Sequence, residues 1–262
     1  MSNTSDPRRL GGVARVYGEA GARRLAAAHV IVVGLGGVGS WAAEAIVRSG
    51  VGRLTLIDGD DVALSNTNRQ LPALDGNYGR PKAEVLRERF QLINPECRIE
   101  IVKQFITEEN ALDLLPRDAD WVLDCIDDLR GKTALVAAAV KLHLPIVVSG
   151  GAGGKRDPGR IVVEDLARVK GDPLAARLRT QLRKRFGFPA GNAAAGRPAK
   201  KFGILAVVSD EPVRQPDEAN VQAAGAEPGV RIGFGAAMVV TATAGLRAAS
   251  VALNAIAEGV QR

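Results

Sequence analysis

The chain has very little cysteine, with only Cys97 and Cys125 among its 262 residues. Two cysteines cannot build a disulfide framework or a four-cysteine zinc site within one chain. Cys97 stands at the entry to a predicted strand and Cys125 inside an apolar run, where an inert, packed thiol is the common case. We therefore expect no nucleophilic thiol, and we expect the protein to reside in the reducing cytoplasm.

The N-terminal residues lack the apolar central run of a secretory signal, and Pro7, Arg8 and Arg9 lie among them. Near the other end, segment 232–257 lacks charge except for Arg247. A run of this length raises the question of a membrane span. The charge near its middle and its wealth of Gly and Ala favour a tightly packed helix in the core or at a dimer interface. We expect no stable membrane insertion, with membrane association through 232–257 as the less favoured alternative.

Acidic residues are scarce in segment 168–201, where Asp172 is the single acid among ten Lys and Arg residues. Most of the net charge of +6 therefore resides there. Such a segment is suited to a polyanionic partner, although a solvated helix face followed by a tail has the same composition. Residues 187–200 are rich in Gly, Ala, Asn and Pro and are predicted to form a mobile loop.

From His29 onward, short β-branched apolar runs alternate with longer segments of helical period, which predicts an α/β fold with a mainly parallel sheet. Helices are predicted over 79–93, with Pro81 in the first turn, and over 129–143. The predicted strands are 29–33, 53–58, 98–104, 120–125, 145–149 and 160–165.

A glycine-rich turn, Gly34-Leu35-Gly36-Gly37-Val38-Gly39, follows the first predicted strand and precedes a segment of helical character. Glycines let a backbone approach a pyrophosphate, and the helix N-terminus offers free N–H groups. Asp58 closes the second strand, where a carboxylate can bind a ribose diol. NAD and ATP both carry that ribose, and a tight turn without ligand also remains open.

The segment from Asp58 to Gln70, with Asp60, Ser65-Asn66-Thr67-Asn68-Arg69, and then Gly79-Arg80-Pro81-Lys82, resembles the E1-like superfamily of adenylating enzymes. The resemblance implies an E1-type Rossmann-like fold, with a mainly parallel sheet extended by later strands and flanked by helices, and an ATP site. It assigns Asn66, Arg69 and Lys82 to the phosphates and Asp127 to Mg²⁺. An arginine can grip phosphate oxygens in a bidentate way, and a lysine acts as a point charge. The predicted site is Gly34, Gly36, Gly37, Gly39, Asp58, Asp60, Asn66, Arg69, Lys82 and Asp127, of which Arg69, Lys82 and Asp127 are the catalytic candidates.

Two further aspartates stand near Asp127. Asp128 precedes a predicted helix, so an N-cap is at least as good an interpretation as a catalytic role. Asp124 lies before the strand end and is interpreted as facing solvent or a partner.

One branch of the superfamily, the tRNA threonylcarbamoyladenosine dehydratases, is similar over most of the chain. The resemblance is carried by Arg9-Leu10-Gly11-Gly12, Arg15-Val16-Tyr17-Gly18, Asn68-Arg69-Gln70, Ile93-Asn94-Pro95-Glu96-Cys97, Gly150-Gly151-Ala152-Gly153-Gly154 and Asp172-Pro173-Leu174-Ala175-Ala176. It implies cyclisation of a modified adenosine beside the anticodon by a homodimer, with ATP and Mg²⁺. Members of the superfamily also use an arginine of the partner subunit. Gly12 occupies that position here, which leaves Arg9, Arg15 or no residue in that role.

We divide the chain into an N-terminal arm and helix (1–28), an ATP-binding part (29–166), a basic helix and loop for tRNA contact (167–202), and a C-terminal strand and apolar helix for dimerisation (203–262). The nearest rival function is adenylation of a sulfur-carrier protein's C-terminus, against which the missing zinc cysteines count. An NAD-dependent oxidoreductase and a nucleotide-sensing scaffold are more distant rivals. A bound monovalent cation, an accessory sulfur-handling protein and the role of 217–228 stay open.

Overall fold

The computed structural model describes residues 8–190, 199–215 and 234–260. Most of the predicted mobile loop 187–200 and all of segment 217–228 lie outside these residues. The helices and strands in chain order are α1 (Gly11–Ala27), β1 (His29–Val33), α2 (Gly39–Arg48), β2 (Arg53–Ile57), α3 (Lys82–Ile93), β3 (Arg98–Val102), β4 (Trp121–Asp124), α4 (Leu129–Lys141), β5 (Ile146–Ser149), β6 (Ile161–Asp165), α5 (Pro173–Phe186), β7 (Leu205–Ser209) and α7 (Met238–Glu258), with short 3₁₀ turns η1 (Leu64–Asn66) and η2 (Pro158–Arg160).

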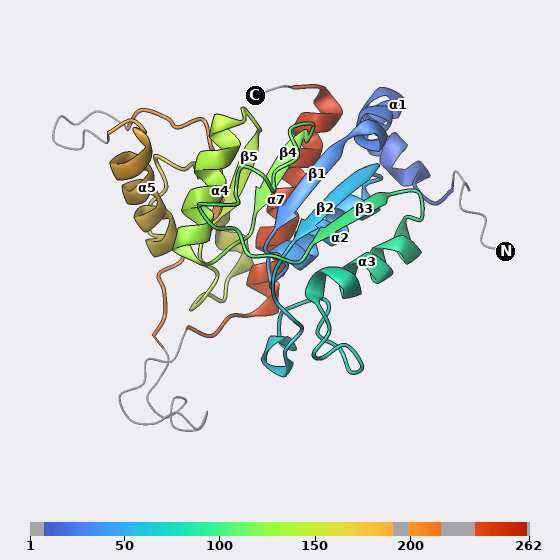
Figure 1. Cartoon of the computed structure of the whole chain (residues 1–262), viewed down its shortest axis with the longest axis horizontal. Coiled ribbons are helices and arrows are strands. Elements are labelled where there is room, and N and C mark those ends of the chain that lie inside the picture. The colour runs from blue at the N-terminus through green and yellow to red at the C-terminus, as the bar shows by residue number, and fades with distance from the viewer. Residues whose placement is uncertain (1–7, 191–198, 216–233, 261–262) are drawn as a thin grey trace.

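The strands form one sheet in the order β3-β2-β1-β4-β5-β7-β6, in which only β6 and β7 pair antiparallel. The predicted α/β fold with a mainly parallel sheet, extended by later strands, is confirmed. The chain builds β1, β2 and β3 outward in one direction and then returns to add β4 and β5 on the other side of β1 (Figure 1). The crevice between β1 and β4 is therefore the switch point where ligands of open α/β sheets bind.

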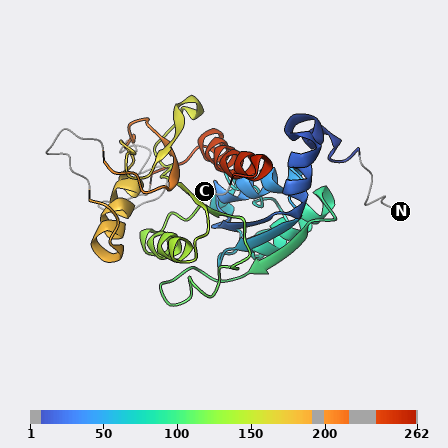
Figure 2. The ribbon, with the colours of Figure 1, turned by 90° about the horizontal axis from the view of Figure 1, so that it is seen from above.

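Helices cover both faces of the sheet because alternate strand residues point to opposite sides. In β1, Val30 and Val32 pack into a core with residues of α2, α3 and α7, whereas Ile31 and Val33 pack into a core with residues of α4 and α5. All five residues of β1 are buried, as expected of a central parallel strand. Figure 2 shows α7 and α4 on opposite sides of the sheet.

The start of α3 differs from the sequence prediction. The helix begins at Lys82, and Pro81 has extended backbone angles (φ −56°, ψ 128°) at the N-cap position. Gly79 has a positive φ of 82°, and Pro81 forms a bridge with Asp61. The turn before the helix thus ties residues 79–81 to the loop after β2, and the helix ends at Ile93 as predicted.

The apolar C-terminal segment forms α7, which packs against α1, α2 and the sheet. Gly245 marks the closest approach, because a Cβ atom there would lie 2.2 Å from the carbonyl oxygen of Val38. Among the described helices, α7 alone has the length and hydropathy to cross a membrane, and 56 % of its most apolar window is buried in the protein. Arg247, its single charged residue before Glu258, is exposed. These contacts make α7 a core helix of this fold.

Candidate functional site

The glycine turn connects β1 to α2 at the carboxyl edge of the sheet. Its glycines allow close backbone packing, and three of them line a cavity. Gly34 has a φ of 85°, and a Cβ there would lie 2.9 Å from the carbonyl group of Cys125. Gly39 is packed against Gly34, because a Cβ would lie 1.7 Å from the Gly34 carbonyl oxygen. Gly34, Gly36 and Gly37 line a cavity of about 1040 Å³, whereas Gly39 lies beneath it and shapes the turn.

Asp58 follows β2 and is held by the backbone on both carboxylate oxygens. Oδ2 accepts a hydrogen bond from the Leu35 N–H of the glycine turn, and Oδ1 accepts one from the Asp60 N–H at 2.7 Å. Burial raises the pKa of Asp58, and the two N–H donors and the charge of Lys82 partly oppose this. Each oxygen keeps a lone pair for a diol, so the side chain can hold a ribose at this wall of the cavity.

Lys82 stands in the first turn of α3, with its side chain buried at the same end of the cavity. Its Nζ lies 2.9 Å from Oδ2 of Asp60, which is itself half exposed. The lysine's position is fixed a second time through its backbone N–H, which donates to the Asp60 carbonyl. The predicted residues Asp58, Asp60 and Lys82 are thus brought together.

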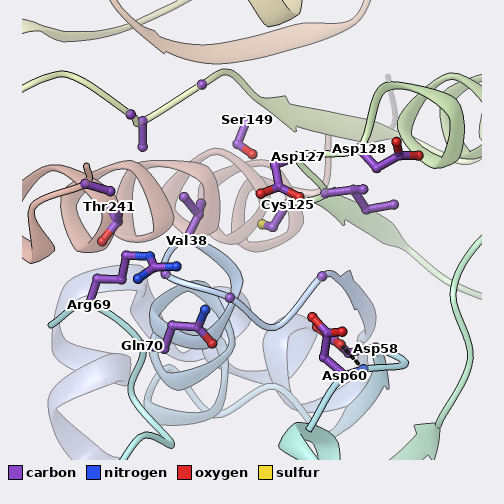
Figure 3. Close-up of a pocket in the computed structure, with 18 of the residues that line it drawn as sticks. Val38, Asp58, Asp60, Arg69, Gln70, Cys125, Asp127, Asp128, Ser149 and Thr241 are labelled. Carbon is purple, nitrogen blue, oxygen red and sulfur yellow. Dashed lines mark hydrogen bonds between the residues drawn. The ribbon is translucent and has the colours of Figure 1, made fainter. Parts of the chain in front are cut away.

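Arg69 lies across the cavity from this group. Its Nη1 donates to the Ser65 carbonyl and to Asn68 Oδ1, both at 2.9 Å. Figure 3 shows Asp58 with Asp60 on one side, Arg69 near Thr241 on the other, and Asp127 between them. Arg69 and Lys82 thus place positively charged side chains on two walls of the cavity.

Asn66 does not line the cavity. Its Oδ1 accepts a hydrogen bond from the Ala63 N–H at 3.1 Å and closes the 3₁₀ turn η1, which leaves the side chain buried. Ser65, Asn68 and Gln70 line the cavity from the same segment. Asn68 also donates to the Ala236 carbonyl at 2.7 Å and so joins the segment to the chain entering α7.

Three aspartates at the end of β4 occupy different environments. Asp127 is exposed and lines the cavity. Asp128 caps α4, with Oδ2 accepting from the Gly131 N–H at 2.7 Å, so the N-cap interpretation is confirmed. The interpretation of Asp124 as solvent-facing is wrong, because it is fully buried and paired with Lys132 at 2.7 Å. Burial raises the pKa of Asp124, and Lys132 opposes that rise.

Asp128 also lines the cavity, but one of its oxygens caps α4, whereas Asp127 has both oxygens available to a magnesium ion. Mg²⁺ commonly takes one or two protein carboxylates and completes its coordination with phosphate oxygens and water. Asp127 has no hydrogen bond or ion pair among the described residues. Its carboxylate lies at the cavity wall (Figure 3). Within the described residues, no group of three or more His, Cys, Asp or Glu side chains is placed to hold a metal ion.

The glycine run after β5 forms the far wall of the cavity, from Gly150 to Gly153. It is anchored by Asp172, whose Oδ2 accepts from the Gly151 N–H at 2.9 Å and whose Oδ1 caps α5 through the Ala175 N–H at 2.8 Å. Lys155 lies 3.4 Å from the same carboxylate and is equally buried. The motifs Gly150–Gly154 and Asp172–Ala176, both of which carry the resemblance to the dehydratase branch, thus form one structural unit, which their spacing in the sequence does not reveal.

Neither cysteine has the environment of a nucleophile. Burial raises the pKa of Cys97 to about 11, and burial with the nearby charge of Asp124 raises the pKa of Cys125 to about 12. Reactive thiols need the opposite shift. This supports the expectation that no enzyme thiol takes part, although Cys125 borders the cavity.

Sequence reasoning assigned no role to Gln70, which stands next to Arg69. Its side chain is 8 % exposed and lines the cavity, and its Oε1 is buried without a hydrogen-bond partner among the described residues. Buried amides are normally satisfied, so such an exception points to a ligand-binding role. The sequence signal that could have pointed to a ligand-binding role for Gln70 is its place in the Asn68-Arg69-Gln70 motif.

Comparison with known proteins supports the resemblance found in the motifs. The tRNA threonylcarbamoyladenosine dehydratase of Escherichia coli is 46 % identical over 253 residues, which cover 94 % of this chain and 92 % of that protein. The enzyme of the same name from Haemophilus influenzae is 44 % identical over 242 residues, covering 92 % and 90 %. A crystal structure of the Escherichia coli dehydratase in complex with ATP matches with a TM-score of 0.84 at 44 % identity, covering 97 % of this chain and 95 % of that one.

The sequence model of the ThiF family matches residues 8–256, nearly the whole chain. The motifs, the sheet order and the relatives therefore agree: the chain belongs to the ThiF family of E1-like proteins.

Proposed function

We propose that this protein catalyses the ATP-dependent dehydration of N6-threonylcarbamoyladenosine beside the anticodon of tRNA. One observation carries the proposal: Asp58, Arg69 and Asp127, the residues expected to bind ATP, share one cavity with Gly150–Gly153, a motif that carries the resemblance to the dehydratases. Relatives that this chain matches over nine-tenths of its length have the same activity in their names. A cytoplasmic location suits a tRNA substrate.

Nucleotide binding is assigned to the near side of the cavity. Asp58 holds the ribose, while the glycine turn and the N-terminus of α2 offer N–H groups to the phosphates. Arg69 and Lys82 offset the charge that develops as pyrophosphate leaves. Asp127 would hold a magnesium ion, which would supply a further positive charge to the phosphates.

The chemistry needs a leaving group better than hydroxide. An oxygen of the threonyl carboxylate attacks the α-phosphorus, a new P–O bond forms, and the bond to the β-phosphate breaks with release of pyrophosphate. An atom of the same threonylcarbamoyl chain then loses its proton, attacks the activated carbonyl carbon and expels AMP. Because the attack is intramolecular, proximity replaces a covalent enzyme intermediate, consistent with the unreactive cysteines.

Dimerisation is assigned to the exposed part of α7, where Met238, Val239 and Leu246 present apolar side chains on the surface. Exposed large apolar side chains grouped on one helix are typical of an interface between copies. The homodimer expected from the resemblance would bury them.

The first test uses Arg69. With ATP and tRNA bearing threonylcarbamoyladenosine, the wild-type protein should release AMP and pyrophosphate, and Arg69→Ala should lower AMP formation by roughly 100-fold or more, because it removes a charge from the transition state. Arg98→Ala is the matched control, since Arg98 is an exposed arginine at the start of β3, the opposite end of the sheet. Equal AMP formation by the two variants would remove Arg69 from the mechanism.

A further inference from the structure

Helix α5 begins at the far wall of the cavity and carries positive charge away from it. Leu174, in its first turn, lines the cavity, and Asp172 joins the start of the helix to Gly151. The helix has 14 residues, so it extends about 20 Å along the edge of the molecule beside α4 (Figure 1). A ligand that leaves the far end of the cavity therefore meets α5 directly.

The cations between residues 168 and 186 fall into two groups. Those of the first group have partners in the protein. Arg168 and Arg179 donate to the carbonyls of Ala199 and Leu166. Arg183 donates to the Pro189 carbonyl and lies over the Phe202 ring, and Arg185 forms an exposed pair with Glu108 at 2.6 Å. The second group is Lys170, Arg177 and Lys184. All three are exposed, and none has a hydrogen bond or ion pair among the described residues.

Arg177 and Lys184 are seven residues apart, which is close to two turns of a helix and places them on one side of α5. Lys170 precedes the helix, which begins at Pro173. The buried residues Ala175, Leu178 and Leu182 lie on the other side and fix the helix against the protein. Arg177 and Lys184 are about 10 Å apart along the helix axis. That separation suits an extended polyanion rather than a single small anion.

We propose that Lys170, Arg177 and Lys184 form a phosphate-contacting stripe that holds the tRNA backbone while the modified nucleoside enters the cavity past Leu174 and Gly151. This inference rests on the proposed function and concerns three positions of the basic segment 168–201. The engaged arginines already have partners in the protein and contribute little to tRNA contact. Phosphate contacts of this kind position a nucleic acid without reading its bases.

The test compares variants that each remove one positive charge from α5. Arg177→Ala and Lys184→Ala should each raise the KM for the modified tRNA several-fold, and each should reduce the slope of log affinity against log salt by about 1. Arg185→Ala is the matched control, because its exposed side chain is already paired with Glu108, and its KM should change less than two-fold. The ATP affinity without tRNA and the melting temperature should stay at the wild-type values for all three.

Three outcomes decide the question. An active wild-type enzyme whose Arg177→Ala and Lys184→Ala variants match Arg185→Ala would overturn the stripe and leave the proposed function standing. An inactive wild-type enzyme would instead contradict the proposed function itself. If Arg177→Glu with Lys184→Glu keeps tRNA affinity but loses retention on phosphatidylglycerol vesicles, the stripe serves a membrane surface and the proposal is wrong.

Discussion

Aspartate residues around the cavity show how environment decides the role of one residue type. Asp58 is held by two backbone N–H groups, Asp128 caps a helix, Asp124 is buried against Lys132, and Asp127 faces the cavity. The places of Asp58 and Asp128 could be predicted, because a strand end and a helix start are visible in the sequence. The pairing of Asp124 could not, since Lys132 approaches it only after α4 folds back on β4.

Gln70 offers the sharpest prediction at the residue scale. An unsatisfied buried polar group costs about 1–3 kcal/mol, and methionine nearly conserves the shape of glutamine without the amide. Gln70→Met should therefore raise the free energy of unfolding of the ligand-free protein by about 1 kcal/mol. It should also reduce the rise in melting temperature that ATP produces, because the amide is available to the ligand.

The control for this prediction is Gln91→Met on the exposed surface of α3, which should leave both quantities unchanged. Thermal unfolding with and without ATP measures both variants. A Gln70→Met protein that is less stable than wild type, or that retains the full ATP effect, would argue for a structural amide.

At the scale of helices and strands, periodicity predicted most elements to within one to three residues at each end. Strand β1 and helix α4 were visible because apolar runs and the cap at Asp128 mark their ends. The predicted start of α3 was three residues too early. Proline commonly occupies the first turn of a helix, whereas Pro81 forms a bridge with Asp61 just before the helix begins. The anchoring of Gly151 by Asp172 joins residues 21 positions apart and has no local signal.

The crossing of α7 over α2 makes a prediction at this scale. A side chain at Gly245 would collide with the Val38 carbonyl, and overpacking in a tight contact typically costs 1–3 kcal/mol. Gly245→Val should lower the free energy of unfolding by about 2–3 kcal/mol in denaturant titration. Arg247→Val, at an exposed position of the same turn that is not assigned to the dimer interface, controls for β-branching and should change it by less than about 0.5 kcal/mol. Equal stabilities would show that α7 does not pack on α2 in this way.

At the scale of the whole molecule, the cavity gathers segments from most of the chain at one edge of the sheet. The glycine turn follows β1, Asp58 follows β2, Asp127 follows β4 and Gly150 follows β5, while Arg69 and Thr241 close the site from a loop and from α7. Parallel strands bring their carboxyl ends together, so the first four could be predicted to meet. The contribution of α7 could not, because no sequence pattern specifies which helix packs beside the turn.

The most direct measurement of the central claim is the mass of the tRNA nucleosides after reaction. The protein is incubated with ATP, Mg²⁺ and tRNA bearing threonylcarbamoyladenosine, the tRNA is digested, and the nucleosides are weighed while AMP is measured. The account predicts that the modified adenosine loses the mass of one water for each AMP formed. An unchanged nucleoside mass while ATP is converted to AMP would contradict it.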